Sequence, residues 1–225
     1  MEEVIVRDTV DFRGELIRKA IHLVSLAIPI IYYFISREAA LFIIAPLTFI
    51  FIIADLARYE VPLFSGFFYK FFGFLLRKHE VDVKKHALNG ATFMLISATI
   101  CVAIFPKYIM ITSFTVLILA DAASAVFGKR FGKHLIFKTK NVPKSYEGSL
   151  AFIIAGIVAV ALTPKIEYSV AEYLIGAASV VVASFAEVLS YDIVDDNIAI
   201  PVSFGLAMWA LHVILLPHVN MYFLG

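Results

Sequence analysis

Charged residues and cysteine are scarce in this sequence. Of its 225 residues, 16% are charged and 61% are hydrophobic, and the mean hydropathy is +0.90. A soluble domain of this length cannot bury so much apolar surface, so the composition excludes an ordinary soluble protein and indicates a membrane protein. The single cysteine, Cys101, excludes a disulfide within the chain, and its apolar neighbours predict a buried, unreactive thiol.

Three familiar sequence patterns are also missing. The first 20 residues carry many charges and no apolar segment, which predicts no cleavable signal peptide. A Gly-x-x-x-x-Gly-Lys-Ser/Thr loop is absent, which excludes the common P-loop type of nucleotide site. The apolar segments show no internal repeat, whereas many transporters are built from repeated halves. We therefore expect one helical membrane domain covering residues 1–225.

Seven apolar segments are candidates for helices that cross about 30 Å of hydrocarbon. They cover residues 20–36, 39–57, 87–105, 108–127, 149–163, 170–189 and 199–216. An eighth segment, 61–76, is rich in aromatic residues, opens with Pro62 and carries Lys70 at its centre, so we expect it to lie in the membrane interface. The predicted fold is therefore an all-α polytopic membrane protein with about seven transmembrane helices and one interfacial helix.

Positive charges are distributed unequally between the two sides that these spans define. With 61–76 in the interface and the N-terminus in the cytoplasm, sixteen of the 19 lysines and arginines fall on the inner side. The outer side holds the other three, Arg37, Lys107 and Lys165. If 61–76 crossed the membrane, every later loop would change sides and most of this bias would disappear. We therefore expect a cytoplasmic N-terminus, and the polar candidate residues then lie at the cytoplasmic ends of helices.

A polar group leads into the first predicted span. Glu15, Arg18, Lys19 and His22 recur at helical spacing and so share one face of a helix. An anchoring collar at the membrane surface explains Arg18 and Lys19 equally well. His22 lies deeper, and a histidine within a span more often faces protein than lipid, which favours a site.

Asp121 stands near the end of the fourth predicted span, followed by small residues that allow another helix to approach closely. An aspartate near the centre of a transmembrane helix costs roughly 2.5–3.5 kcal/mol on insertion scales, so such residues usually have a task. A hydrogen bond within the helix bundle is the alternative. Residues 128–148 then form a predicted cytoplasmic basic loop with Gly128, Gly132 and Lys133, which suits phosphate binding. A helix C-cap followed by a patch for lipid headgroups is equally consistent with this loop.

Further polar residues flank the later spans. Lys144, Glu147 and Gly148 precede the fifth span, and Glu187 lies near the cytoplasmic end of the sixth. Three carboxylates follow in residues 192–196, where helix capping is the alternative interpretation. Carboxylates opposite a basic loop also suit Mg²⁺, which prefers one or two carboxylates together with phosphate oxygens.

These segments together resemble a known family. DAASAVFGKRFGKH (121–134) and PKSYEGS (143–149) are similar to the CTP-binding region of the phosphatidate cytidylyltransferases and the CTP-dependent lipid kinases. ELIRKAIH (15–22), DNIAIP (196–201) and HALNGATF (86–93) resemble segments of the kinases, a group containing dolichol kinase, phytol kinase and the CTP-using diacylglycerol kinase. The His-Gly-Gly and paired-aspartate signature of the cytidylyltransferases is missing here. The resemblance therefore favours the kinases.

The resemblance implies transfer of the γ-phosphate of CTP, with Mg²⁺, to the primary hydroxyl of a lipid alcohol. A polyprenol or dolichol is the expected acceptor, and diacylglycerol, phytol and geranylgeraniol are alternatives. Catalytic roles fall to Asp121, Arg18, Lys19 and Glu147. Contacts with CTP fall to Gly128, Lys129, Gly132, Lys133, Lys144, Gly148 and Asn197. Metal coordination falls to Asp121, Glu147 and Asp196, and contacts with the lipid substrate to Glu15 and His22.

Two other functions stay open at this point. A cytidylyltransferase that forms a CDP-lipid shares the 121–148 block and would release pyrophosphate instead of CDP. A lipid transporter or scramblase would place charges near the middle of several spans, whereas these spans are mostly apolar at their centres. The expected partners are CTP, a lipid of the bilayer and the membrane itself, with no nucleic acid. The sequence carries no signal for an oligomeric state.

Overall fold

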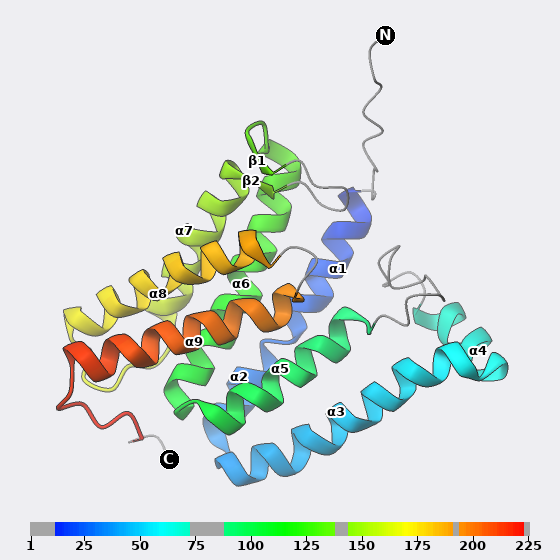
Figure 1. Cartoon of the computed structure of the whole chain (residues 1–225), viewed down its shortest axis with the longest axis horizontal. Helices are drawn as coiled ribbons and strands as arrows, with labels where there is room; N and C mark the ends of the chain where they lie inside the picture. Colours follow the sequence, from blue (N-terminus) through cyan, green and yellow to red (C-terminus); the bar gives the residue numbers. More distant parts are fainter. Residues whose placement is uncertain (1–11, 73–87, 138–143, 191–193, 223–225) are drawn as a thin grey trace.

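The computed structural model describes residues 12–72, 88–137, 144–190 and 194–222. Within these ranges the chain is almost entirely helical (Figure 1). The helices and strands, in chain order, are α1 (Phe12–Val24), α2 (Ala27–Phe34), α3 (Arg37–Glu60), α4 (Pro62–Phe72), α5 (Gly90–Ile104), α6 (Lys107–Phe131), β1 (Leu135–Phe137), β2 (Lys144–Ser145), α7 (Tyr146–Leu162), α8 (Val170–Leu189) and α9 (Asp196–Leu215).

Five stretches of the described chain are long and apolar enough to cross a membrane. They are Leu16–Phe34, Arg37–Glu60, Lys107–Phe131, Val170–Leu189 and Asp196–Leu215. The first joins α1 and α2, which separate near Ser25 because Pro29 has no N–H to continue the helical hydrogen bonds. The two remaining expected spans form α5 and α7, apolar helices of 15 and 17 residues. The predicted helical architecture with several candidate membrane spans is thus confirmed for the described residues, and the count of seven spans stays a prediction.

Helix α6 forms the centre of the molecule, behind α8 and α9 in Figure 1. It packs against α7, α9, α1 and α2, and 78% of its most apolar 18-residue window is buried. The corresponding share for α3, which lies at the edge of the bundle, is 17%. A helix whose whole circumference is apolar and protein-covered is a core element, whereas α3 leaves most of its surface for lipid.

Small residues let α7 and α8 approach closely. A Cβ added to Gly156 of α7 would lie 2.6 Å from Val180 Cγ1 of α8, and Gly176 of α8 faces Val160 of α7 in the same way. Each glycine thus leaves space for a valine side chain of the opposite helix to pack against it. Membrane helices use small residues in this manner because lipid gives no hydrophobic drive for their association, so close van der Waals contact must supply it.

The connection between α7 and α8 is held by a buried carboxylate. Glu172, which is fully buried, accepts backbone N–H bonds from Ile166 at 3.0 Å, Glu167 at 3.1 Å and Ser169 at 3.3 Å. The Ser169 hydroxyl in turn accepts the backbone N–H of Glu172, which completes a capping box for α8. Glu172 therefore has a structural role at the end of α8 far from Glu187.

A second buried polar group, which the sequence patterns did not reveal, joins α3 to α5. Asp55 forms an ion pair with Arg58 at 3.0 Å, and both side chains are almost fully buried. The same carboxylate accepts the backbone N–H of Asn89 at 2.6 Å and its amide at 2.9 Å, so it fixes the residue that caps α5. The Arg58 guanidinium also lies 5.2 Å from the ring centre of Phe68, which ties α4 to this group.

The segment 128–148, expected to be a loop, is only partly one. Helix α6 continues to Phe131, so Gly128 and Lys129 are helical. Strands β1 and β2 then pair in antiparallel fashion, and α7 begins at Tyr146. A strand of three residues paired with one of two is too short to leave a periodic sequence pattern. Residues 138–143 lie outside the described chain.

The orientation predicted from the positive charges has a direct test. We expect a cysteine at the exposed Lys133 to react with an impermeant thiol reagent from the cytoplasmic side. A cysteine at His218, whose side chain is 65% exposed, should react from the opposite side. The native Cys101 is fully buried and contributes little background. Reaction of both positions from the same side would contradict the predicted topology.

Candidate functional site

The site begins with a buried ion pair between α1 and α6. Lys19 donates to Asp121 Oδ2 at 2.5 Å, and Nε2 of His22 lies 3.5 Å from the same oxygen. Lys19 is 6% exposed and Asp121 is 9% exposed. Because Lys19 and His22 are three residues apart in α1, both side chains face Asp121. The shared helical face predicted for these residues is therefore directed at the predicted aspartate.

A second buried group joins β2 to α8 and α9. The Lys144 ammonium donates to Glu187 Oε1 and, at 3.2 Å, to Asp196 Oδ2. Asp196 also accepts the Ser190 hydroxyl through its other oxygen. Burial alone would lower the pKa of Lys144, but the carboxylates of Asp196 and Glu187 outweigh it and raise this pKa above its ordinary value. This environment therefore favours the charged form of Lys144.

Helix α6 connects the two groups. Ser124, one turn after Asp121, donates its hydroxyl to Glu187 Oε1 at 3.3 Å. Five elements, α1, α6, β2, α8 and α9, thus contribute to one continuous polar group within an apolar bundle. We call it the lysine–carboxylate cluster, and it consists of Lys19, His22, Asp121, Lys144, Glu187 and Asp196.

Burying this many charges is expensive, which indicates a function beyond stability. The penalty for removing an ion from water is several kcal/mol even after relaxation, and a buried ion pair is often no more stable than apolar residues of the same volume. Two lysines face three carboxylates in the cluster, and His22 adds a positive charge only when it is protonated. Carboxylates gathered in a buried site favour the approach of a cation or the uptake of a proton.

Glycine and serine residues bring the N-terminus of α7 against α6 beside this cluster. A Cβ on Gly148 would lie 3.2 Å from the Ser124 carbonyl oxygen, and one on Gly132 would lie 2.7 Å from Ser145 Oγ. The Ser145 hydroxyl accepts the backbone N–H of Gly148 at 3.2 Å and caps α7. Gly128 and Gly148 therefore serve close helix packing. The open phosphate-binding loop expected from Gly128 and Gly132 is not the conformation seen here.

The remaining predicted site residues lie outside the cluster. Glu147 interacts instead with His134, whose ring nitrogen is 2.8 Å from the carboxylate, and this hydrogen bond lowers the pKa of Glu147 to about 2. Lys129 and Lys133 are exposed at the end of α6 and in the turn that follows it.

Three further predicted site residues are Asn197, Arg18 and Glu15. Asn197 is 7% exposed and uses its amide to bond Asp195 at 2.7 Å and the Gly90 carbonyl at 3.4 Å, so it links α9 to α5. Arg18 is half-buried in α1, next to Lys19 in the chain. The side chain of Glu15 lies outside the described part of the structure.

Each predicted metal ligand is paired with a basic side chain in this structure. Asp121 pairs with Lys19, Glu147 with His134, and Asp196 with Lys144. Among the described residues, no group of three His, Cys, Asp or Glu side chains is placed to hold a metal ion. Mg²⁺ does not need such a cage, because it usually keeps waters and binds one or two carboxylates plus substrate phosphates. The carboxylates of Asp121 and Asp196 are of the type that suits an ion delivered with a nucleotide.

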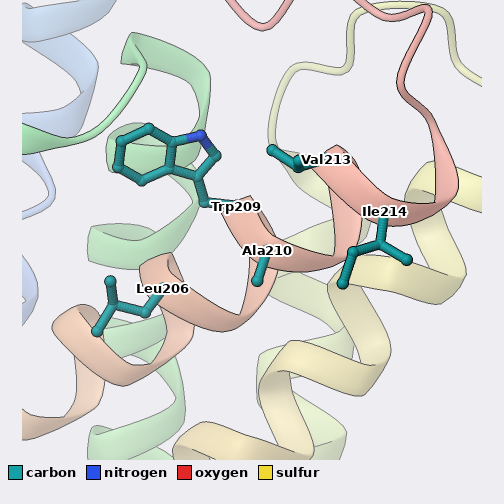
Figure 2. Close-up of a pocket in the computed structure, with 5 residues that line it drawn as sticks. All are labelled: Leu206, Trp209, Ala210, Val213 and Ile214. Atoms are coloured by element: carbon teal, nitrogen blue, oxygen red, sulfur yellow. The ribbon is translucent and has the colours of Figure 1, made fainter.

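Glu187 and Ser124 are the main members of the site that sequence motifs did not assign. The one available signal for Glu187 was a carboxylate within an apolar segment, the same signal that identified Asp121. A separate groove on α9 is lined by apolar side chains of Leu206, Trp209, Ala210, Val213 and Ile214 (Figure 2). It lies toward the other end of α9 from Asp196 and suits a hydrocarbon chain better than a phosphate.

Comparison with known proteins gives three informative similarities. An uncharacterized protein of Rickettsia prowazekii is 28% identical over 201 residues, which cover 88% of this chain and 95% of the relative. The CTP-dependent diacylglycerol kinase 1 of Schizosaccharomyces pombe is 32% identical over 103 residues, 46% of this chain and 44% of that kinase. The enzyme of the same name from Saccharomyces cerevisiae is 31% identical over 116 residues, 50% of this chain and 38% of that kinase.

The similarity to the two kinases covers only part of each protein. The chain matches less than half the length of each of the two kinases. No protein-family model matches it. No solved structure matches it. The predicted likeness to dolichol and phytol kinases stays a prediction. Over about half of its length, this chain is thus similar to CTP-dependent lipid kinases.

Proposed function

We propose that this protein is an integral-membrane kinase that transfers the γ-phosphate of CTP to the primary hydroxyl of a lipid alcohol. The observation that carries the proposal is the lysine–carboxylate cluster, in which Lys19 and Lys144 are held beside Asp121 and Asp196. Phosphoryl transfer depends mainly on positioning and on stabilising the charge of the phosphate oxygens, and this cluster supplies cations and carboxylates for both tasks.

The cluster residues have distinct roles in this proposal. Lys19 and Lys144 bind phosphate oxygens of CTP, Lys19 in exchange for Asp121 and Lys144 in exchange for Asp196. Asp121 and Asp196, once released from the lysines, would hold the Mg²⁺ ion that accompanies CTP, and Asp121 is the acceptor for the hydroxyl proton of the lipid. When bound, Mg²⁺ neutralises charge on the β- and γ-phosphate oxygens.

The chemistry balances without any further reactant. The lipid oxygen forms a bond to the γ-phosphorus, and the bond from this phosphorus to the oxygen bridging it to the β-phosphate breaks. CDP leaves with that oxygen, and the hydroxyl proton passes to a carboxylate of the cluster. The lipid tail stays in the bilayer throughout. Helix α1 suits this arrangement, because it exposes the apolar side chains of Leu16, Ile17 and Ile21 on one side and directs Lys19 into the cluster on the other.

The acceptor is a lipid with a primary hydroxyl on an apolar tail. The names of the two yeast kinases favour diacylglycerol. The polyprenol or dolichol expected from the sequence motifs, and phytol or geranylgeraniol, remain in the same chemical class. We also propose that the site faces the cytoplasm, where CTP is present, because the predicted topology places the basic residues there.

Purified protein in lipid nanodiscs, supplied with Mg²⁺ and CTP labelled at the γ-phosphate, provides the test. We expect label to appear in a phosphorylated lipid and CDP to be released, with ATP used at least about tenfold less well, since the 121–148 block resembles CTP-using enzymes and a P-loop is absent. A panel of diacylglycerol, dolichol, polyprenol, phytol and geranylgeraniol identifies the acceptor. Release of pyrophosphate would identify a cytidylyltransferase, and equal use of ATP and CTP would contradict the proposed nucleotide specificity.

A further inference from the structure

Glu187 is a buried carboxylate that the motifs leave without a role. It lies in α8, two residues before the end of this helix, and is 2% exposed. A glutamate in this setting is almost never fully buried unless its charge is paired. Its contacts therefore indicate what it does.

The contacts of Glu187 converge on Lys144. Oε1 accepts the Lys144 ammonium and, at 3.3 Å, the hydroxyl of Ser124. The second partner of Lys144 is Asp196 at 3.2 Å, which stands on α9. The ammonium is thus held between carboxylates from two helices, and Ser124 fixes one of these carboxylates to α6, one turn beyond Asp121.

The unused oxygen of Glu187 argues against a purely structural role. Within the described chain, Oε2 is buried and has no hydrogen-bond partner. In contrast, both oxygens of Glu172 in the same helix accept backbone N–H groups. A buried acceptor without a partner destabilises the folded state, so a carboxylate that served stability alone would be better satisfied.

Lys144 needs such a partner because the strand that carries it is too short to fix its side chain. Strand β2 contains two residues, and a lysine side chain is long and flexible, so ordering it costs rotamer entropy. Fixing the ammonium before the nucleotide arrives removes this ordering from the free energy of binding.

We propose that Glu187 is a positioning residue that holds the Lys144 ammonium in place to bind a phosphate group of the nucleotide. This role rests on the proposed function, since it assigns Lys144 to the phosphates of CTP. Glu187 acts through the position of its carboxylate oxygen, and Lys144 is the group that touches the nucleotide.

Three substitutions at this position separate geometry from charge. In Glu187→Ala the ammonium keeps Asp196 alone, and we expect the KM for CTP to rise about tenfold or more while kcat changes less than about threefold, since a hydrogen bond to a charged group contributes about 1.5–3 kcal/mol. Glu187→Asp keeps the charge but withdraws the oxygen by one methylene, so the KM should also rise several-fold. Glu187→Gln retains an oxygen that accepts from Lys144 and Ser124, and its KM should stay close to that of the wild type.

A double-mutant cycle tests whether Glu187 acts through Lys144. In a Lys144→Met background, Glu187→Ala should cause no further rise in the KM for CTP, because the group that it positions is gone. Glu172→Ala is the matched control, a buried carboxylate of the same helix outside the cluster. It should lower the melting temperature and leave the KM for CTP unchanged.

Several results would overturn the role of Glu187. These are an unchanged KM in both Glu187→Ala and Glu187→Asp, a Glu187→Gln variant as impaired as Glu187→Ala, and an equal rise in KM with and without Lys144. If Glu187→Ala does not fold, the Asp and Gln variants still decide. A failure of the proposed function is distinguishable from these results, because the wild-type protein itself would then transfer no phosphate from CTP to any lipid. The role of Glu187 would be rejected in that case too.

Discussion

The Asp121→Asn variant is expected to lose CTP-dependent lipid phosphorylation by about 10³-fold or more in kcat, the size of effect seen when a group that stabilises charge or accepts a proton in the transition state is removed. Asparagine keeps the size of the side chain and one oxygen near Lys19 and His22, which lie 2.5 and 3.5 Å from the aspartate. It removes the negative charge that a divalent cation or a hydroxyl proton requires. The measurement is the initial rate of phosphate transfer from γ-labelled CTP at saturating lipid.

The control for this prediction is a cation near the cluster in sequence but outside it in space. Arg130 is exposed at the end of α6 and lies over the Phe131 ring at 5.6 Å. We expect Arg130→Ala to retain most of the activity. A folded Asp121→Asn protein that keeps most of its CTP-dependent rate would mean that Asp121 is only a structural polar contact, and the proposed mechanism would be wrong.

Local sequence patterns named Lys19, His22 and Asp121 as candidate site residues but did not predict how they pair. The spacing of Lys19 and His22 placed both on one face of a helix, and a carboxylate within an apolar segment identified Asp121. These two parts of the site are 102 residues apart in the chain. Their contact depends on the packing of α1 against α6, which no periodicity encodes. The pairing of Lys144 with Glu187 and Asp196 is equally non-local.

The glycine-rich segment shows a different limit of sequence reasoning. Gly128 and Gly132 were expected to expose backbone N–H groups to phosphate, and Gly148 was expected to contact CTP. They instead allow α6, Ser145 and the first turn of α7 to meet, with Gly132 too close to Ser145 for any Cβ. Glycine was a correct sign that another group approaches the backbone closely at these positions, but in this structure that group belongs to the protein itself. In the same way, the sequence shows that Lys129 and Lys133 are charged, but it does not predict that both side chains are exposed.

The Lys19→Met variant is expected to show the second large effect, on both stability and activity. Methionine has similar length and suits an apolar surrounding, but it leaves the Asp121 charge buried without its closest partner. Breaking a buried ion pair in this way typically costs about 3–5 kcal/mol. The lost phosphate contact should also lower kcat/KM for CTP by about 10²–10³-fold. Thermal unfolding in detergent and the kinase assay measure the two effects separately.

The double variant Lys19→Met/Asp121→Asn distinguishes a catalytic pair from a structural one. Removing both charges eliminates the unpaired carboxylate, so the melting temperature should recover most of the loss seen in Lys19→Met alone. Activity should not recover, because both the cation for the phosphate and the carboxylate remain absent. If stability and activity returned together, the pair would serve only to join α1 to α6, and the catalysis would have to be assigned to the Lys144 side of the cluster.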